Sequence, residues 1–326
     1  MDDDVVESAK SFEAMRARAR NAPGWSCDHQ AAIQAKPGQA PQMSWAYRIE
    51  HPVFGQTIHV LSRAEYVLVF LALYSDKLFW LRDQFKFDLF AGPHPLHGHP
   101  GLLGQPVRQH SGTLEIARYL EVFDSHPWTM KVLEGIEQSS VPVPLEMLGD
   151  FLLFLVDNKG PYCVHFDIKS SAAAHGKPGP QRFNAGVGIK RNENAANKNA
   201  IKAHYMAELG IRQVFLHPGL LDTQVACNLR FLFQWTVRSV ELGFIEQQEL
   251  AELFRTALRL GTPPALVIAR CASRWGWSAT ECRRLLFQSI WRRELRVDLF
   301  DAILVDRALQ PERRDVLLVY ENWFMR

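Results

Sequence analysis

Residues 149–171, GDFLLFLVDNKGPYCVHFDIKSS, predict two short apolar strands joined by a tight turn. Residues 151–156 form a continuous apolar run, and residues 162–168 have the aromatic and β-branched side chains typical of a strand. Between them, residues 157–161 (DNKGP) have the composition of a turn, because Gly and Pro set its backbone dihedrals. The pattern indicates a β-hairpin around which the rest of the chain can be organised.

Three charged side chains mark one end of this predicted hairpin. Asp150 enters the first strand, and Asp167 and Lys169 stand at the end of the second, where alternation along a strand directs both to one face. The hairpin can bring Asp150 to that face too. Carboxylates and a lysine on one buried rim cost free energy unless something compensates, and Mg²⁺ would compensate because it prefers oxygen ligands. The competing interpretation is that these residues only solvate the strand ends.

Composition sets further bounds on the class of protein. The 326 residues suffice for about two domains, and 47% hydrophobic with 22% charged residues is typical of a globular chain. Because the net charge is only +2, affinity for a polyanion has to come from local patches. The five cysteines are scattered without zinc-binding spacing, the acidic N-terminus has no apolar signal core, and the longest apolar run is too short to span a bilayer. We therefore expect a cytoplasmic protein with no membrane segment.

The order of elements predicts a polar N-terminal arm (1–45), an α/β domain (46–221, with an insertion at 91–147) and a helical C-terminal domain (222–326). The expected helices are 7–20, 63–74, 113–123, 129–138, 192–209, 225–242, 246–260, 264–275 and 279–292. Besides the hairpin, the expected strands are 46–49, 57–61, 83–89, 211–217 and 295–299.

Two polar residues before the hairpin also matter. Ser62 and Glu65 have the spacing of a capping box at the start of the predicted helix 63–74, which gives Glu65 a structural role as one interpretation. Gln84 lies in the predicted strand 83–89.

An Asp on one strand and an acid-x-Lys pair ending the next resemble the PD-(D/E)xK nuclease superfamily. More narrowly, a helix with Glu65 near its start, a strand carrying Gln84, a GDFLL-type strand and an acid-x-Lys strand resemble the TnsA family, the endonuclease subunits of heteromeric cut-and-paste transposases. A later helix ending at Gly210, the segment GIRQVFLHPG and Asn228-Leu229 extend the resemblance over roughly residues 57–300. Two departures are Gly149, where a Pro usually precedes the Asp, and the long separation of Glu65 from Asp150.

The resemblance implies a restriction-endonuclease-like mixed sheet flanked by helices, followed by a winged-helix-like C-terminal domain. It implies a metal-dependent DNA endonuclease that cuts the non-transferred (5′) strand at transposon ends. Glu65, Asp150 and Asp167 would hold Mg²⁺, as two ions for which Mn²⁺ can substitute, and Lys169 would orient and polarise the attacking water. Gln84 matches a recurrent strand glutamine of uncertain role. The implied partners are transposon-end DNA, a DDE-class transposase and an AAA+ ATPase regulator.

Other polar groups have two interpretations each. Lys190, Lys198 and Lys202 either contact DNA phosphates or form a solvated helix face. The arginines and tryptophans of residues 273–296 suit either DNA or a groove on a partner protein. The insertion carries His94, His97, His99 and His110, which either bind a metal or lie in a Pro- and Gly-rich loop.

Two rival functions remain open on sequence alone. One is a stand-alone restriction or repair nuclease that uses the same acids and lysine. The other is a non-catalytic adaptor that binds DNA or a partner, although such a protein would have no reason to keep the costly acid cluster.

Overall fold

The computed structural model describes residues 45–102, 104, 106–132, 140–172 and 185–326, with residues 14, 16–21, 25 and 29–38 of the N-terminal arm. Side chains are described for these residues except 132 and 185–192. Most of the expected helix 7–20 therefore lies outside the described residues.

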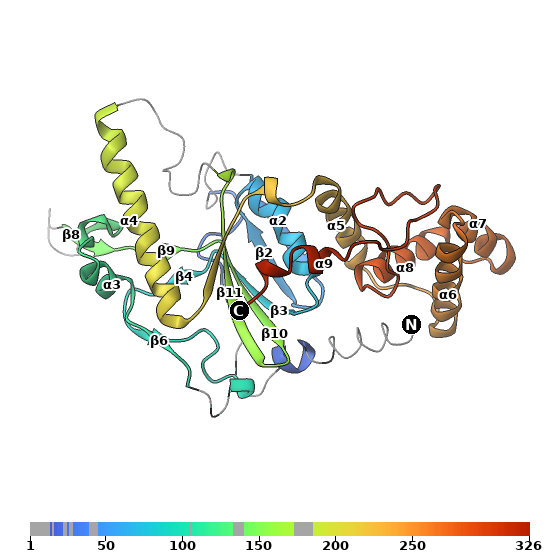
Figure 1. Ribbon diagram of the computed structural model, residues 1–326, viewed down its shortest axis with the longest axis horizontal. Coiled ribbons are helices and arrows are strands. Elements are labelled where there is room, and N and C mark those ends of the chain that lie inside the picture. The colour runs from blue at the N-terminus through green and yellow to red at the C-terminus, as the bar shows by residue number, and fades with distance from the viewer. Residues whose placement is uncertain are drawn as a thin grey trace.

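A four-stranded mixed sheet forms the centre of the molecule (Figure 1). Its strands are β3 (Leu78–Asp83), β10 (Phe151–Asp157), β11 (Gly160–Ile168) and β12 (Arg212–Leu216). Their order is β12-β11-β10-β3, with β10 antiparallel to both of its neighbours and β12 parallel to β11. The hairpin predicted from residues 149–171 is thus confirmed, and it supplies the two inner strands.

Helices cover both faces of this sheet. Leu153 of β10 belongs to the hydrophobic cluster that contains Leu68 of α2 (Arg63–Tyr74). The neighbouring Leu152 belongs to a second cluster, which contains Ile201 of α4 (Ala185–Leu209). Because successive side chains point to opposite faces and both faces are covered, β10 is apolar at every position from 151 to 156. This explains the unbroken apolar run in the sequence.

The C-terminal part is helical and packs against α2. Its helices are α5 (Thr223–Thr236), α6 (Phe244–Leu260), α7 (Pro264–Trp275), α8 (Ala279–Trp291) and the short α9 (Val316–Val319). Leu229 of α5 and Leu286 of α8 lie in the same hydrophobic cluster as Leu68 of α2, so the core continues from the sheet into the C-terminal helices.

The last residues return to the central hairpin, where the C-terminus lies beside β11 in Figure 1. Tyr162 Oη donates a 2.7 Å hydrogen bond to the carbonyl of Phe324. Arg326 forms a 2.7 Å ion pair with Asp157 at the hairpin turn. The C-terminal tail therefore belongs to the packing of the α/β part.

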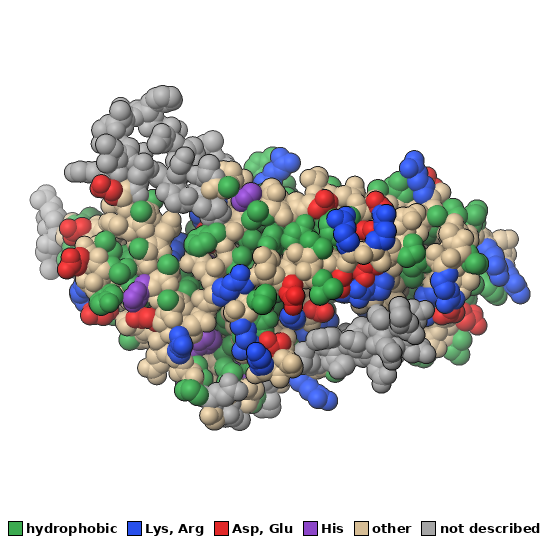
Figure 2. Space-filling model, in the orientation of Figure 1, with side chains coloured by type: hydrophobic (Ala, Val, Ile, Leu, Met, Phe, Trp, Pro, Cys, Tyr) green, Lys and Arg blue, Asp and Glu red, His purple; other side chains and the backbone are tan. Residues whose placement is uncertain are grey.

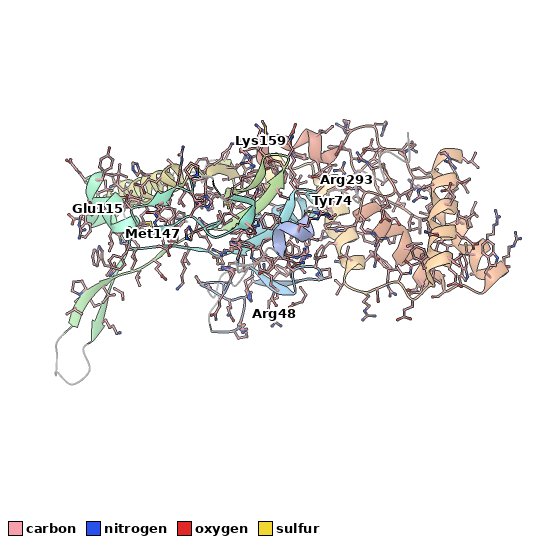
Figure 3. All side chains as sticks on the ribbon, turned by 90° about the horizontal axis from the view of Figure 1, so that it is seen from below. Arg48, Tyr74, Glu115, Met147, Lys159 and Arg293 are labelled. Atoms are coloured by element: carbon pink, nitrogen blue, oxygen red, sulfur yellow. The ribbon has the colours of Figure 1, made fainter. Side chains whose placement is uncertain are left out.

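Small two-stranded sheets complete the fold. They pair β1 (Tyr47–His51) with β2 (Gln56–Val60), β4 (Lys86–Phe87) with β9 (Met147–Leu148), β5 (Gly92–Pro93) with β6 (Gln109–His110), and β7 (Trp128–Val132) with β8 (Ser140–Pro144). The remaining elements are α3 (Thr113–Tyr119) and the 3₁₀ turns Pro100–Leu102, Phe123–Ser125, Pro218–Leu220 and Glu321–Trp323. The β7–β8 hairpin projects from the body of the molecule (Figure 3).

The expected helix 129–138 is wrong over its first residues, 129–132, which belong to β7, and its other residues lie outside the described part of the chain. The register pairs Thr129 with Val143 and Met130 with Pro142 in an antiparallel ribbon. Proline lacks the N–H that an inner strand needs, so Pro142 and Pro144 fit only an edge strand such as β8. Pairing with β8, which begins at residue 140, therefore outweighs the short helical periodicity of this stretch.

Two expected strands also differ. The strand expected at 83–89 lies earlier, at Leu78–Asp83, and Gln84 ends it with a left-handed backbone (φ 45°), after which the chain turns into β4. The strand expected at 295–299 forms only an isolated bridge between Val297 and Pro311. Leu295, Val297 and Leu299 are buried as the alternation predicts, but Asp298 is buried as well, and a side-chain pattern cannot supply a pairing partner.

The expected helices agree with the structure more closely than the expected strands do. Both ends of the predicted helices 63–74 and 264–275 are confirmed. The helix expected at 225–242 ends at Thr236, and that expected at 192–209 begins at Ala185. Within the described part of the chain, no helix is both long and apolar enough to cross a membrane.

Candidate active site

The end of the β10–β11 hairpin opposite its turn brings Asp150, Asp167 and Lys169 together. Lys169 Nζ lies 2.7 Å from Asp167 Oδ1 and 3.8 Å from Asp150 Oδ2. Phe151 pairs with Phe166, so the antiparallel register places Asp150 opposite Asp167. The N–H of Ile168 also donates a 2.6 Å hydrogen bond to Asp150 Oδ2, which fixes the direction of that carboxylate.

Glu65 has the capping geometry that its spacing predicts. Its carboxylate accepts hydrogen bonds from Ser62 Oγ (2.7 Å) and the N–H of Leu61 (3.0 Å), and its own N–H donates to Ser62 Oγ (3.1 Å). Gln84 joins this group to the hairpin, since its backbone N–H donates to the Asp150 carbonyl over 2.9 Å. Glu65 lies near enough to Asp150 for the charge of Asp150 to act on it while Glu65 caps α2.

Burial and mutual repulsion raise the proton affinity of two of these acids. Burial, reinforced by the Asp150 charge, raises the pKa of Glu65 to about 7. Burial also raises the pKa of Asp150, despite the nearby Lys169 ammonium. In both cases burial makes the charged carboxylate costly, so each group holds its proton more tightly than it would in water.

Asp167 and Lys169 behave as an ion pair. Burial opposes ionisation of both, but the Lys169 ammonium lowers the pKa of Asp167 on balance. The Asp150 and Asp167 carboxylates in turn raise the pKa of Lys169 above its ordinary value. Lys169 is therefore a protonated hydrogen-bond donor at neutral pH.

The three lysines of α4 differ in their surroundings and in how far the structure describes them. Lys202 points into the protein: its Nζ donates a 2.6 Å hydrogen bond to the Leu148 carbonyl and lies 5.5 Å from the centre of the Phe87 ring. Lys198, one turn earlier, is half-buried. Lys190 lies outside the residues whose side chains are described.

Two residues of the site were missed in the sequence. Gln213 of β12 donates a 3.2 Å hydrogen bond from Nε2 to Asp167 Oδ2. His165 is fully buried on the same strand face as Asp167, with its ring edge-on to Phe85 and Phe87, and burial lowers its pKa to about 3. Alternation along residues 162–168 already placed His165 beside Asp167, whereas nothing in the sequence located Gln213.

The chemical types of the side chains at this site suit a hard divalent cation. Glu65, Asp150 and Asp167 offer carboxylate oxygens, which Mg²⁺ prefers, and a bound cation would offset the cost of burying the Glu65 and Asp150 charges. In the described arrangement, no three His, Cys, Asp or Glu side chains lie close enough to hold an ion jointly. The Lys169 ammonium contacts both aspartates, so it holds this part of the site together.

Among the described residues of the insertion, no three histidines or acids come close enough to hold a metal ion together. His99 Nε2 lies 2.8 Å from the Ala19 carbonyl, and His94 Nδ1 accepts a hydrogen bond from the N–H of Leu96. His110 lies 3.3 Å from Asp88, and its ring is tilted against that of Tyr205 with the centroids 4.3 Å apart. These separate contacts are structural, and they leave the metal interpretation of the cluster without support.

The arginines expected on the C-terminal surface are mostly paired within the chain. Arg284 pairs with Glu281, Arg292 with Glu294, Arg293 with Asp315, and Arg296 with Glu312 and Asp315. Basic and acidic side chains are accordingly interspersed over this part of the face shown in Figure 2. Trp275 remains 39% exposed and stacks on Trp277, with the Arg274 guanidinium 5.2 Å from its ring.

No protein-family model matches the chain, and no curated protein is significantly similar to it in sequence. The functional argument therefore depends on the residues and their geometry.

Proposed function

We propose that this protein is a metal-dependent DNA endonuclease that cuts the non-transferred strand at transposon ends. The convergence of Asp150, Asp167 and Lys169 at one end of the central hairpin, with Glu65 beside them, carries this proposal. Asp150 directly precedes β10, Asp167 lies near the end of β11 and Lys169 directly follows it, so the three residues flank adjacent antiparallel strands as the TnsA resemblance implies.

The order of elements supports the same proposal. Helix α2, strands β3, β10 and β11, helix α4 and strand β12 follow one another in the order that the resemblance implies. We infer on this basis a restriction-endonuclease-like fold for residues 46–221. The winged-helix-like interpretation of the C-terminal domain has less support, because residues 295–299 form a single bridge.

The site residues divide the chemistry as follows. Asp150 and Asp167, with Glu65, would hold Mg²⁺, which supplies positive charge against the charge that develops on the phosphate. Lys169 stays protonated because of its two carboxylate neighbours, so it acts as a donor that orients and polarises water rather than as a base. Gln213 and Ile168 keep the two aspartates in fixed directions.

The C-terminal helices suit a protein partner better than DNA. Four of the arginines that could contact phosphates are paired with acids of the same chain. The exposed Trp275 beside Arg274 is the kind of aromatic and cationic surface that anchors protein interfaces. We therefore propose that this part binds the other subunits, a DDE-class transposase and an AAA+ ATPase.

The test is a cleavage assay with a co-encoded transposase and its transposon-end DNA. We expect Mg²⁺-dependent nicking of the 5′ strand, in which Mn²⁺ replaces Mg²⁺, and little cleavage without the transposase. Efficient cleavage by the protein alone would favour a stand-alone restriction or repair nuclease with the same site. Absence of cleavage under every condition, with intact DNA or partner binding, would favour the non-catalytic adaptor.

A further inference from the structure

We propose that His29 and Asp83 are positioning residues of the acid site. Together they clamp the N-terminal arm to the end of β3, and this clamp holds Gln84 in contact with Glu65 and Asp150. The structural half of the inference, that the clamp holds Gln84, concerns only the folded protein. The catalytic half, that the clamp supports turnover, rests on the proposed nuclease function.

The described part of the N-terminal arm is fastened to the α/β part at two places. At the first, the Trp25 ring packs edge-on against Phe79 of β3 with the centroids 5.8 Å apart, and Trp25 Nε1 donates a 3.3 Å hydrogen bond to the Pro95 carbonyl. At the second, residues 29–35 contact the end of β3 and the neighbouring β2. Because both attachments involve β3, the arm follows this strand toward the acid site.

The second attachment centres on Asp83, the last residue of β3. His29 Nε2 lies 2.7 Å from the Asp83 carbonyl oxygen and 3.2 Å from Asp83 Oδ1. Carbonyl and carboxylate oxygens accept hydrogen bonds, so Nε2 has to carry a proton. Asp83 is 1% exposed, and its Oδ2 accepts a 2.5 Å hydrogen bond from the N–H of His59. Since a buried carboxylate is costly without donors, the His29 contact both holds the arm and satisfies Asp83.

This clamp lies next to Gln84, whose conformation needs support. Gln84 has a left-handed backbone (φ 45°), which is strained for a residue other than glycine. From the arm, the N–H of Ala32 donates a 3.2 Å hydrogen bond to the Gln84 carbonyl. The N–H and the side-chain amide of Gln84 are bound to the Asp150 carbonyl and to Glu65 Oε2. Gln84 therefore joins the arm to two residues of the acid site, and a displacement of the arm reaches the site through it.

The first experiment measures amide hydrogen exchange by mass spectrometry on the full chain without metal. His29→Leu removes the hydrogen-bond donor, whereas His29→Gln keeps one at the place of Nε2. In His29→Leu we expect exchange to quicken roughly tenfold in residues 31–36 and 83–86, the size expected for local opening after the loss of one hydrogen bond. His29→Gln should exchange at nearly the wild-type rate. So should the control Gln30→Ala, which changes an exposed neighbour on the arm. Residues 152–156 of β10 should be unaffected in every variant.

Three results would overturn the structural half. Unchanged exchange in His29→Leu would mean that His29 does not hold the arm. Faster exchange in residues 31–36 alone would mean that the arm detaches without a change at Gln84. An equal increase that includes residues 152–156 would mean that the substitution only destabilises the fold as a whole.

The second experiment measures steady-state cleavage in the assay described above. We expect His29→Leu to lower kcat roughly tenfold and to leave KM for the DNA near the wild-type value, because a displaced Gln84 alters the geometry of Glu65 and Asp150 rather than DNA binding. His29→Gln should recover most of the kcat. A wild-type kcat in His29→Leu, with exchange faster as expected, would overturn the catalytic half. If the wild-type protein cleaves under no condition while exchange changes as expected, the clamp stands, and both the catalytic half and the nuclease proposal fail.

Discussion

The Gln84 side-chain amide donates a 3.1 Å hydrogen bond to Glu65 Oε2, and both residues are buried. Gln84 can make this bond because it follows β3 in a left-handed conformation (φ 45°), which turns its side chain toward the start of α2. The same residue binds the Asp150 carbonyl through its N–H. Gln84 thus connects the capped helix to the hairpin that carries the other acids, and this gives a concrete role to the glutamine that the resemblance left unassigned.

The first prediction concerns the chemistry. Asp150→Ala and Lys169→Ala should each lower the cleavage rate by about 10³-fold or more, since each change removes several kcal/mol of transition-state stabilisation. Strand cleavage on a labelled transposon end in Mg²⁺ measures the loss, and a melting curve shows whether the fold is kept. A folded Asp150→Ala protein that cleaves at the wild-type rate would refute the site assignment.

A second prediction separates the two roles of Glu65. Glu65→Gln keeps acceptor capacity for Ser62 and Leu61, because a capping box accepts either residue, but it removes a charged oxygen from the site. We expect α2 to remain capped and the Mg²⁺ requirement of cleavage to rise. Ser62→Ala is the matched control, since it should cost about 1 kcal/mol of stability without a change in metal dependence. Unchanged metal dependence in Glu65→Gln would leave Glu65 with its structural role alone.

The pH dependence of the metal-free protein follows from the same residue. The folded-state pKa of Glu65 is raised from 4.5 to about 7, so the folded state binds this proton more tightly than the unfolded chain does. The stability that this group contributes is therefore present below pH 4.5 and is lost as the pH rises to about 7. The loss amounts to about 3 kcal/mol at most.

Glu65→Gln should abolish this part of the pH dependence. Urea unfolding of both proteins across that window, in the presence of a chelator, measures the difference between their unfolding free energies. We expect the wild type to lose stability relative to the variant as the pH rises. A constant difference would show that Glu65 does not titrate in this range.

The sequence predicted the hairpin and its charged end because both depend on local rules. The turn chemistry of residues 157–161 sets the register, and the register then places Asp150 opposite Asp167. What could not be predicted depends on partners distant in the chain. Gln213 reaches Asp167 only because β12 lies parallel to β11, and Lys202 reaches Leu148 only because α4 covers that face of the sheet.

Gly149 gives a further prediction, because it stands where the resemblance expects a proline. A Cβ at this position would lie 2.2 Å from Phe85 Cε1 and 2.7 Å from His165 Nε2, so no larger residue fits while these rings stay in place. Gly149→Ala should cost about 1–3 kcal/mol of stability through overpacking and displace the adjacent Asp150. Thermal melting measures the cost. Phe85→Leu should relieve part of it in the double variant, and if it does not, the clash is not the cause.

The last prediction separates two parts of the C-terminal region, the buried tail around Phe324 and the exposed surface around Trp275. Phe324 is 2% exposed and its carbonyl accepts from Tyr162 of β11, so the tail is part of the core around the central hairpin. Trp275, the last residue of α7, is 39% exposed. A cut at residue 222 would remove both, and loss of cleavage after such a cut would not reveal which one mattered.

Single substitutions in the full chain avoid this problem. Phe324→Ala should destabilise the protein by about 3–5 kcal/mol, because it leaves a cavity beside the hairpin, and should impair cleavage with it. Trp275→Ala should change stability by no more than about 0.5 kcal/mol but weaken association with the transposase or the ATPase. Melting curves and partner binding by light scattering distinguish the two effects. If Trp275→Ala leaves partner binding intact and instead weakens a salt-sensitive affinity for DNA, this surface contacts phosphates, and the C-terminal helices belong to a nuclease that recognises its own DNA.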